Sequence, residues 1–253
     1  MKHIQLHLEK ITKLKDETIR KGCKDVFNAF LVKDESFDVI FDIPVCKSNC
    51  GEIPKNLIAY DLTKSSTQFN SYVHFYIDDQ KFDGPRGIWN DPQKLLDRVK
   101  NFDGVITPDF STNIDFPTPL KIYNTYKMRA IGCWLKRNGI KVINNVRWGD
   151  KSTYDYCFSG IPKHDIICIG TIGCIKEKKY WELYKSGLDE MMKRLEPKIL
   201  LVYGNVPDKF FKEYKNTDVI IKHYPSQTSL AFGKKRDSVW KETLDTFQEH
   251  LVI

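Results

Sequence analysis

The chain has 253 residues, of which 41% are hydrophobic and 29% are charged. This composition excludes a disordered chain, because it supplies enough apolar side chains to form a core. The 40 Lys and Arg residues against 33 Asp and Glu give a formal net charge of +7, but the excess is dispersed and its densest run is Lys234–Arg236. A dispersed excess is more typical of a solvated surface than of a nucleic-acid footprint.

The length suits one large α/β domain, and no linker or low-complexity tract divides the sequence, so we expect residues 1–253 to form a single domain. No run approaches the ~20 apolar residues that span a bilayer, and we expect no membrane segment. The seven cysteines contain no CxxC pair, and no secretory leader precedes them. Reduced thiols and a cytoplasmic location are therefore expected.

The first elements are helical, and βα alternation follows them. Within residues 1–34, apolar side chains recur among lysines at three- and four-residue spacing, which predicts one or two amphipathic helices from Leu6 to Val32. Short runs rich in Val, Ile, Phe and Tyr then alternate with helical segments, as is typical of βα repeats. The predicted strands are Asp38–Ile43, Val73–Ile77, Gly104–Ile106, Lys141–Val146, Ile166–Ile169, Ile199–Val202 and Val219–Ile221.

Helix boundaries are marked by capping residues. Asp91 and Pro92 are typical of an N-cap and a first helical residue, and Asn138–Gly139 is typical of a helix stop. Residues 46–71 are rich in Lys, Ser, Thr and Asn, which favours an insertion or a hairpin over one end of the sheet. The predicted helices are Asp91–Phe102, Thr118–Asn138, Glu177–Leu195, Pro207–Tyr214 and Arg236–Leu251.

The apolar runs favour a mostly parallel sheet. Ile166–Ile169 and Ile199–Val202 are apolar at consecutive positions, and a strand tolerates this only when both of its faces are covered. Such strands, separated by helices, predict an α/β domain that is barrel-like and related to the eight-stranded βα barrel, in an incomplete or seven-stranded form. An open, doubly wound sheet is the alternative.

Polar and aromatic side chains follow the ends of the predicted strands. In parallel α/β folds the functional site forms at the carboxyl ends of the strands, so we expect these side chains to lie together. Asp79, Asp109 and His223 supply acid–base groups, and we predict that they are catalytic. The predicted substrate-binding residues are Ser111, Asn145, Arg147, Trp148, Thr171, Gly173, Tyr203 and Lys222.

These residue types suit a phosphate-bearing nucleotide. Arg147 offers a planar fork for phosphate, and Trp148 offers a ring on which a base can stack. Each residue taken alone also has a structural interpretation: Asp109 can cap a turn, Arg147 can pair with Asp150, and His223 can be a satisfied structural histidine. The prediction depends on the number of such residues, because a rim that only has to be soluble does not require this mixture of acids, amides and aromatic rings.

Established catalytic motifs and a complete metal site are absent from the sequence. It contains no P-loop, no GxGxxG after a strand, no GxSxG, no HExxH and no zinc deaminase pattern. Cys46 and Cys50 supply two of the four ligands that zinc usually takes. Asp78, Asp79 and Asp109 carry hard oxygen ligands that allow a divalent metal, but we assign no metal ligand. Cys174 is a weaker candidate, as a nucleophile aided by a histidine.

Several stretches together resemble a known family. FDGVITPDFS (102–111), INNVRWGD (143–150), IGTIGC (169–174) and LVYGNVP (201–207), with VHFYIDD (73–79) and WNDP (89–92), resemble the family catalogued as domain of unknown function 4417. The resemblance runs from about Asp38 to Lys235 and implies a bacterial, phage or mobile-element setting, without an activity. It implies motif positions for Asp79, Asp109, Ser111, Asn145, Arg147, Trp148, Gly149, Gly170, Gly173, Tyr203, Gly204 and His223.

Three hypotheses about function stay open at this point. The first is a hydrolase acting on a nucleotide or nucleic-acid substrate, with Arg147 and Lys222 holding phosphate, Asp109 as base or nucleophile, and His223 assisting. The second is a non-catalytic binder that sequesters a nucleotide signal or a host protein. The third is a DNA- or RNA-binding replication accessory that uses the lysine-rich helices. The sequence does not determine the oligomeric state.

Overall fold

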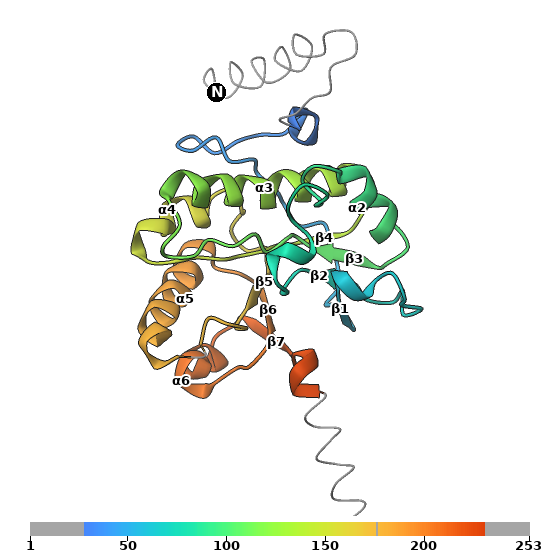
Figure 1. Ribbon diagram of the computed structural model, residues 1–253. Coiled ribbons are helices and arrows are strands. Elements are labelled where there is room, and N and C mark those ends of the chain that lie inside the picture. The colour runs from blue at the N-terminus through green and yellow to red at the C-terminus, as the bar shows by residue number, and fades with distance from the viewer. Residues whose placement is uncertain (1–27, 176, 231–253) are drawn as a thin grey trace, which may run out of the picture.

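The computed structural model describes residues 28–175 and 177–230, in which seven short strands alternate with helices (Figure 1). The strands are β1 (Leu57–Ala59), β2 (Tyr72–His74), β3 (Gly104–Ile106), β4 (Val142–Asn145), β5 (Ile166–Gly170), β6 (Ile199–Tyr203) and β7 (Ile220–Tyr224). The α-helices are α2 (Pro92–Val99), α3 (Thr118–Arg137), α4 (Tyr154–Cys157), α5 (Trp181–Leu195) and α6 (Asp208–Phe211). Short 3₁₀ helices include η1 (Ala29–Val32), η3 (Asp79–Lys81) and η5 (Lys178–Tyr180).

The strands form one sheet in simple chain order. Every neighbouring pair from β1–β2 to β6–β7 is parallel. A doubly wound sheet would reverse its strand order at a switch point, and this order has no reversal. The sheet curls into a half-barrel, so the prediction of a barrel-like parallel α/β fold is confirmed and the doubly wound alternative is not observed.

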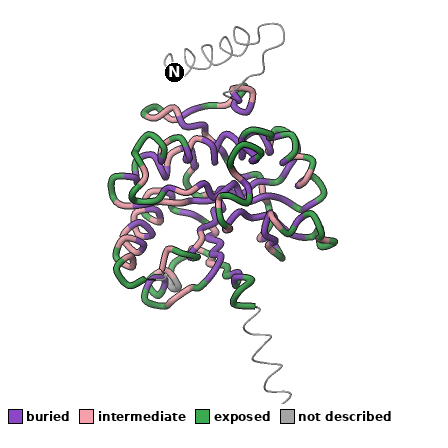
Figure 2. The backbone as a smooth tube through the Cα atoms, viewed as in Figure 1, coloured by how far each residue is buried: buried purple, intermediate pink, exposed green. Residues whose placement is uncertain are grey.

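Alternate side chains along each strand face the two sides of the half-barrel. The outer face is covered by helices: one apolar cluster joins β2–β4 to α2 and α3, and another joins β5 and β6 to α5 and α6. Figure 1 shows α3 lying along β3 and β4, with α5 and α6 beside β5–β7. The inner face carries a third cluster that includes Tyr72, Ile143, Cys168 and Leu201. Figure 2 shows the buried segments gathered in the middle of the molecule, with exposed segments in the loops and helix turns around them.

The helix boundaries follow the capping residues in the sequence. The Asp91 carboxylate accepts a hydrogen bond from the Lys94 amide at 3.1 Å, and Pro92 opens α2. The long helix α3 ends before Asn138, and Gly139 follows with φ +82°, a conformation that costs glycine little. These boundaries agree with the prediction to within a few residues.

A polar wedge separates the amino-terminal ends of β4 and β5. Direct pairing of these strands begins only at Asn144 and Ile167. Nearer their amino ends, the Asn49 amide donates to the Val142 carbonyl at 3.2 Å, and the Ser48 hydroxyl donates to the Ile166 carbonyl at 3.0 Å. Ser48 and Asn49 thus supply hydrogen-bond partners that a neighbouring strand would otherwise provide.

The predicted strand Asp38–Ile43 is wrong. The Asp38 carboxylate accepts hydrogen bonds from the amides of Ile40, Phe41 and Ile43, and Asp42 has φ +53°. An aspartate that binds backbone amides just ahead of it in the chain stabilises a turn in competition with a strand. The segment is therefore a loop closed by a bridge between Phe37 and Pro44.

Residues 46–71, predicted as an insertion or a hairpin, instead hold the wedge and β1. This strand pairs in parallel with β2. It brings the number of described strands to seven in place of Asp38–Ile43, the first of the predicted strands. Of the predicted N-terminal helices only η1 is described, because residues 1–27 lie outside the described ranges, as does the predicted helix Arg236–Leu251. Among residues 28–175 and 177–230, no helix combines the length and apolar character needed to cross a bilayer.

His74 is an uncharged histidine in the inner layer of the half-barrel. Its side chain is only 1% exposed, and its Nδ1 accepts a hydrogen bond from the Tyr76 amide at 3.2 Å. The imidazole lies 4.2 Å from the ring of Tyr203 and 5.5 Å from that of Tyr76. Burial lowers the pKa of His74 to about 3.

We predict that His74 makes the fold sensitive to acid. In the unfolded chain His74 binds a proton near pH 6.5, whereas in the folded protein it does so only near pH 3. Above pH 6.5 the imidazole is neutral in both states, so its protonation takes no stability from the fold. As the pH falls below this value, stability should be lost at up to about 1.4 kcal/mol per pH unit. The free energy of unfolding, measured with urea at several pH values between 7 and 4, should depend less steeply on pH in His74→Asn. This variant keeps an acceptor for the Tyr76 amide. Equal dependence on pH in the wild type and in His74→Asn would contradict the assignment.

Candidate functional site

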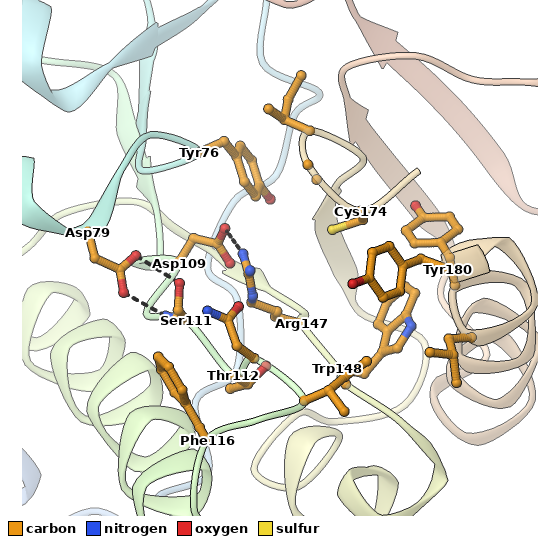
Figure 3. Close-up of a pocket in the computed structure, with 18 of the residues that line it drawn as sticks. Tyr76, Asp79, Asp109, Ser111, Thr112, Phe116, Arg147, Trp148, Cys174 and Tyr180 are labelled. Atoms are coloured by element: carbon orange, nitrogen blue, oxygen red, sulfur yellow. Dashed lines mark hydrogen bonds and ion pairs between the residues drawn. The ribbon is translucent and has the colours of Figure 1, made fainter. Parts of the chain in front are cut away.

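A cavity of about 920 Å³ opens at the carboxyl ends of β2–β5. Loops that follow β2, β3, β4 and β5 form its walls, together with the first turns of α5 (Figure 3). Its lining is rich in aspartates and aromatic rings: Asp78, Asp79, Asp109 and Asp115, and Tyr76, Phe116, Trp148, Tyr180 and Tyr184. Volume and position fit a small-ligand site, since such sites in parallel α/β folds form where the strands end.

An ion pair between Asp109 and Arg147 lies at the centre of the cavity. Arg147 Nη1 is 2.6 Å from Asp109 Oδ2, and the two side chains point toward each other in Figure 3. The other carboxylate oxygen of Asp109 accepts a hydrogen bond from the Asn145 amide group at 2.8 Å. Both oxygens of Asp109 are thus held, so the carboxylate fixes the position of Arg147.

Strand pairing brings these residues together. β3 and β4 are in register at Ile106 and Ile143, and the Thr107 hydroxyl accepts a hydrogen bond from the Asn145 backbone amide at 2.8 Å. The chain leaves both strands at this level, so Asp109 and Arg147 follow their strand ends by two or three residues on the same side. Parallel register therefore explains why residues 38 positions apart form a pair.

Burial shapes the charge state of the pair. Burial raises the pKa of Asp109 above the ordinary range of an aspartate, and the neighbouring Arg147 and Asn145 oppose this rise. For Arg147, burial acts to lower the pKa, but the carboxylates of Asp109 and Asp79 outweigh it and raise the pKa further. The guanidinium is therefore a fixed positive charge in the cavity.

A second polar contact forms one side of the cavity. Asp79 Oδ1 accepts a hydrogen bond from the Ser111 hydroxyl at 3.0 Å, and Asp79 Oδ2 accepts one from the Ser111 amide at 3.1 Å. Asn124 of α3 donates to the Ser111 carbonyl at 2.5 Å. Asp79 thereby joins the loop after β2 to the loop after β3, as Figure 3 shows.

Two aromatic walls lie close against glycines. The Tyr76 ring packs on Gly170, where a Cβ atom would come within 2.7 Å of it, and the Tyr76 hydroxyl donates to Asn145 Oδ1 at 3.0 Å. The Trp148 indole packs on Gly187 of α5, where a Cβ atom would overlap it. Glycine at both positions lets a ring lie flat against the backbone.

A family model described as "Domain of unknown function (DUF4417)" matches residues 35–225. The chain belongs to this family. It is similar to the Gene 1 protein of Mycobacterium phage L5, with 33% identity over 157 residues, which cover 61% of this chain and 67% of the phage protein. It is also similar to the Gene 1 protein of Mycobacterium phage D29, with 32% identity over 157 residues, 61% of this chain and 57% of that protein.

The resemblance to DUF4417 predicted from the sequence motifs is confirmed, and this DUF4417 chain is a homologue of phage proteins. The matched segment spans between about half and two thirds of the length of these two relatives. No solved structure matches the chain.

The structure brings most of the predicted site residues of this DUF4417 protein to one place. Those that line the cavity are Asp79, Asp109, Ser111, Arg147, Trp148 and Gly173. Three others lie behind its wall: Asn145 binds Asp109, Tyr203 stacks under Tyr76 with ring centroids 5.2 Å apart, and the Thr171 amide donates to the Tyr203 carbonyl. Arg147 pairs with Asp109 and not with Asp150, the partner that the structural interpretation of the sequence named.

Lys222 and His223 are not among the residues that line the cavity. Both lie on β7, where Lys222 is in register with Leu201 and His223 with Val202. Val202 belongs to the outer core, so His223 faces outward, and its Nε2 lies 2.5 Å from the Gly204 carbonyl. The two side chains therefore lie on opposite faces of an edge strand.

Several residues that line the cavity were not identified as site residues from the sequence. Tyr76 lies in an apolar run that predicts only a buried strand, although Tyr72, His74 and Tyr76 recur at the two-residue period of one strand face. Tyr184 lies within a predicted amphipathic helix, where an aromatic residue normally indicates core packing. Thr112 follows Ser111 in a loop, and its burial depends on the fold.

The described residues hold no group of three or more His, Cys, Asp or Glu side chains arranged to bind a metal ion. Asp78, Asp79 and Asp109, which we considered for a divalent metal, do not form such a group. In the described part of the chain Cys46 and Cys50 are free thiols, and Cys50 contacts the Tyr72 hydroxyl at 3.0 Å.

We predict that the contact between Gly187 and Trp148 reverses the usual effect of a helical Gly→Ala change. Alanine normally stabilises a helix interior by about 1 kcal/mol relative to glycine. Here the new methyl group displaces the indole, so Gly187→Ala should lower the free energy of unfolding by about 1–3 kcal/mol. In a Trp148→Leu background the same change should become stabilising, because the smaller side chain leaves space. Denaturant unfolding of the four proteins checks this, and the same sign in both backgrounds would contradict the packing.

Proposed function

We propose that this DUF4417 protein binds a nucleotide-class ligand with a single anionic group, such as a nucleoside monophosphate, in the strand-end cavity. The observation that carries the proposal is the Arg147 guanidinium, which the buried Asp109 carboxylate holds in a cavity with aromatic walls. A guanidinium has five N–H donors, and the ion pair uses one of them. The remaining donors suit the oxygens of a phosphate or carboxylate.

The charge of the lining sets the class of ligand. Among the described residues that line the cavity, Arg147 is the one lysine or arginine, whereas four are aspartates. Several unscreened phosphates would be repelled there, because like charges in a partly buried site repel strongly. A ligand with one anionic group near Arg147 and N–H donors elsewhere matches this lining better. The amino groups of a nucleobase are donors of this kind.

Hydrolysis of the bound ligand is a second candidate function. The observation that favours it is Asp109, a buried carboxyl group in the cavity with a raised pKa, since carboxyl groups of this kind recur in active sites as acids or bases. The test is to incubate each of the four common nucleoside monophosphates with the protein and analyse the mixture by liquid chromatography and mass spectrometry. Product formation that Asp109→Asn abolishes would support hydrolysis, and recovery of intact nucleotide would support binding alone.

Binding through Arg147 predicts a defined mutational pattern. Removal of the Arg147 charge should raise the dissociation constant of the tightest-binding nucleoside monophosphate by about 10- to 100-fold, because charge-assisted hydrogen bonds are lost. Isothermal titration calorimetry measures this constant. Arg147→Met alone also leaves Asp109 buried and unpaired, at a cost in stability of about 3–5 kcal/mol. The double variant Asp109→Asn/Arg147→Met removes both charges and should recover most of that stability without recovering binding.

A surface arginine provides the matched control. Arg194 also pairs with carboxylates, those of Asp155 and Glu190, but it lies outside the cavity. Arg194→Met should leave nucleotide affinity unchanged. Wild-type affinity in the folded double variant would contradict the assignment of Arg147 to the anionic group.

A further inference from the structure

Two hydroxyl groups in the cavity wall are buried without a hydrogen-bond partner. The side-chain oxygens of Thr112 and Tyr184 have no hydrogen-bond partner in the described part of the chain. These residues are 1% and 4% exposed, and both line the cavity. An unsatisfied buried hydroxyl costs free energy, so each one in a native fold requires an explanation.

Both residues lie close to Trp148 or to its neighbour in the chain. The Tyr184 ring is 5.3 Å from the indole. The backbone carbonyl of Thr112 lies beside Gly149, the residue after Trp148: a Cβ atom added at Gly149 would be 3.2 Å from it. Because α5 covers the part of the indole that packs on Gly187, the part that lines the cavity is left for a ligand.

We infer that Thr112 and Tyr184 form the polar edge of a stacking subsite, in which a flat nitrogen heterocycle lies on Trp148 and exchanges hydrogen bonds with the two hydroxyls. The inference rests on the proposed function and deepens it, because it names the residues that recognise the base. A hydroxyl both donates and accepts, so it matches the ring nitrogens, carbonyl oxygens and amino groups at the edge of a nucleobase. A purely hydrocarbon ring would stack on the indole and leave both hydroxyls unsatisfied.

Other unpartnered hydroxyls supply a control. Tyr156 is also buried with an unpartnered hydroxyl, and it is not among the cavity residues. Tyr156→Phe therefore removes the same kind of group without touching the subsite. Tyr184→Phe and Thr112→Val remove the two groups that the inference assigns to the ligand.

The first measurement is the thermal midpoint of each protein without ligand. Tyr184→Phe, Thr112→Val and Tyr156→Phe should each keep or raise the midpoint, because each removes an unsatisfied polar atom. A lower midpoint for Tyr184→Phe or Thr112→Val would show that the hydroxyl has a partner within the folded protein, and would remove that residue from the subsite.

The second measurement is calorimetric titration with the four nucleoside monophosphates and with the free bases adenine and cytosine. Tyr184→Phe and Thr112→Val should each lower the affinity for the best-binding probe by about 3- to 10-fold, which corresponds to the loss of one hydrogen bond. Tyr156→Phe should bind it as the wild type does. This combination of retained stability and weakened binding would support the inference.

The remaining outcomes separate the inference from the proposed function. If nucleotides bind the wild type, Tyr184→Phe and Thr112→Val equally, the subsite is wrong and the proposed function stands. If only the free bases bind, and the two variants weaken them, the subsite stands and the proposed role of Arg147 falls. If none of the probes binds the wild type, both are overturned.

Discussion

The arrangement at the carboxyl end of β4 depends on the hydrogen bonds of Asn145. Its backbone amide donates to Thr107, its carbonyl accepts from Arg129 at 3.0 Å, its side-chain amino group donates to Asp109, and its side-chain oxygen accepts from Tyr76. A buried amide with every group satisfied is rigid, because each alternative orientation leaves a buried polar atom unpaired. Asn145 thereby fixes the carboxylate that positions the guanidinium of the cavity.

Support for this strand end also comes from the outer face of the sheet. Arg129 of α3 is fully buried, and its guanidinium donates to the carbonyls of Asn145, Ser159 and Cys157. Burial lowers the pKa of Arg129 to about 10, which still leaves it charged at neutral pH. One buried cation thus joins β4, α3 and the segment after α4, while the Ser48–Asn49 wedge holds the opposite end of the same strand. The cavity is built on a strand that is fixed at both of its ends.

The sequence was informative where burial follows from local pattern. The runs Ile166–Ile169 and Ile199–Val202 predict central parallel strands because both of their faces are covered, and residues such as Asp109 and Arg147 could be identified because they follow strand ends. The strand prediction failed at Asp38, where one side chain stabilises a turn, and the sequence did not show that His223 lies outside the cavity, on an edge strand that turns it outward. It could not identify Thr112 or Tyr184, because an unsatisfied hydroxyl is a property of three-dimensional packing that no residue pattern encodes.

The charge of the chain and the charge of the cavity have opposite signs. The whole sequence carries a formal charge of +7, yet the lining of the cavity, as far as the structure describes it, holds four aspartates and a single arginine. A positive field at long range attracts anions in general, whereas the acidic lining discriminates at short range against those with several charges. Under the proposed function these two effects act in sequence: the surface raises the local concentration of anionic ligands, and the cavity admits one whose single anionic group reaches Arg147. Selectivity of this kind comes as much from repulsion as from attraction.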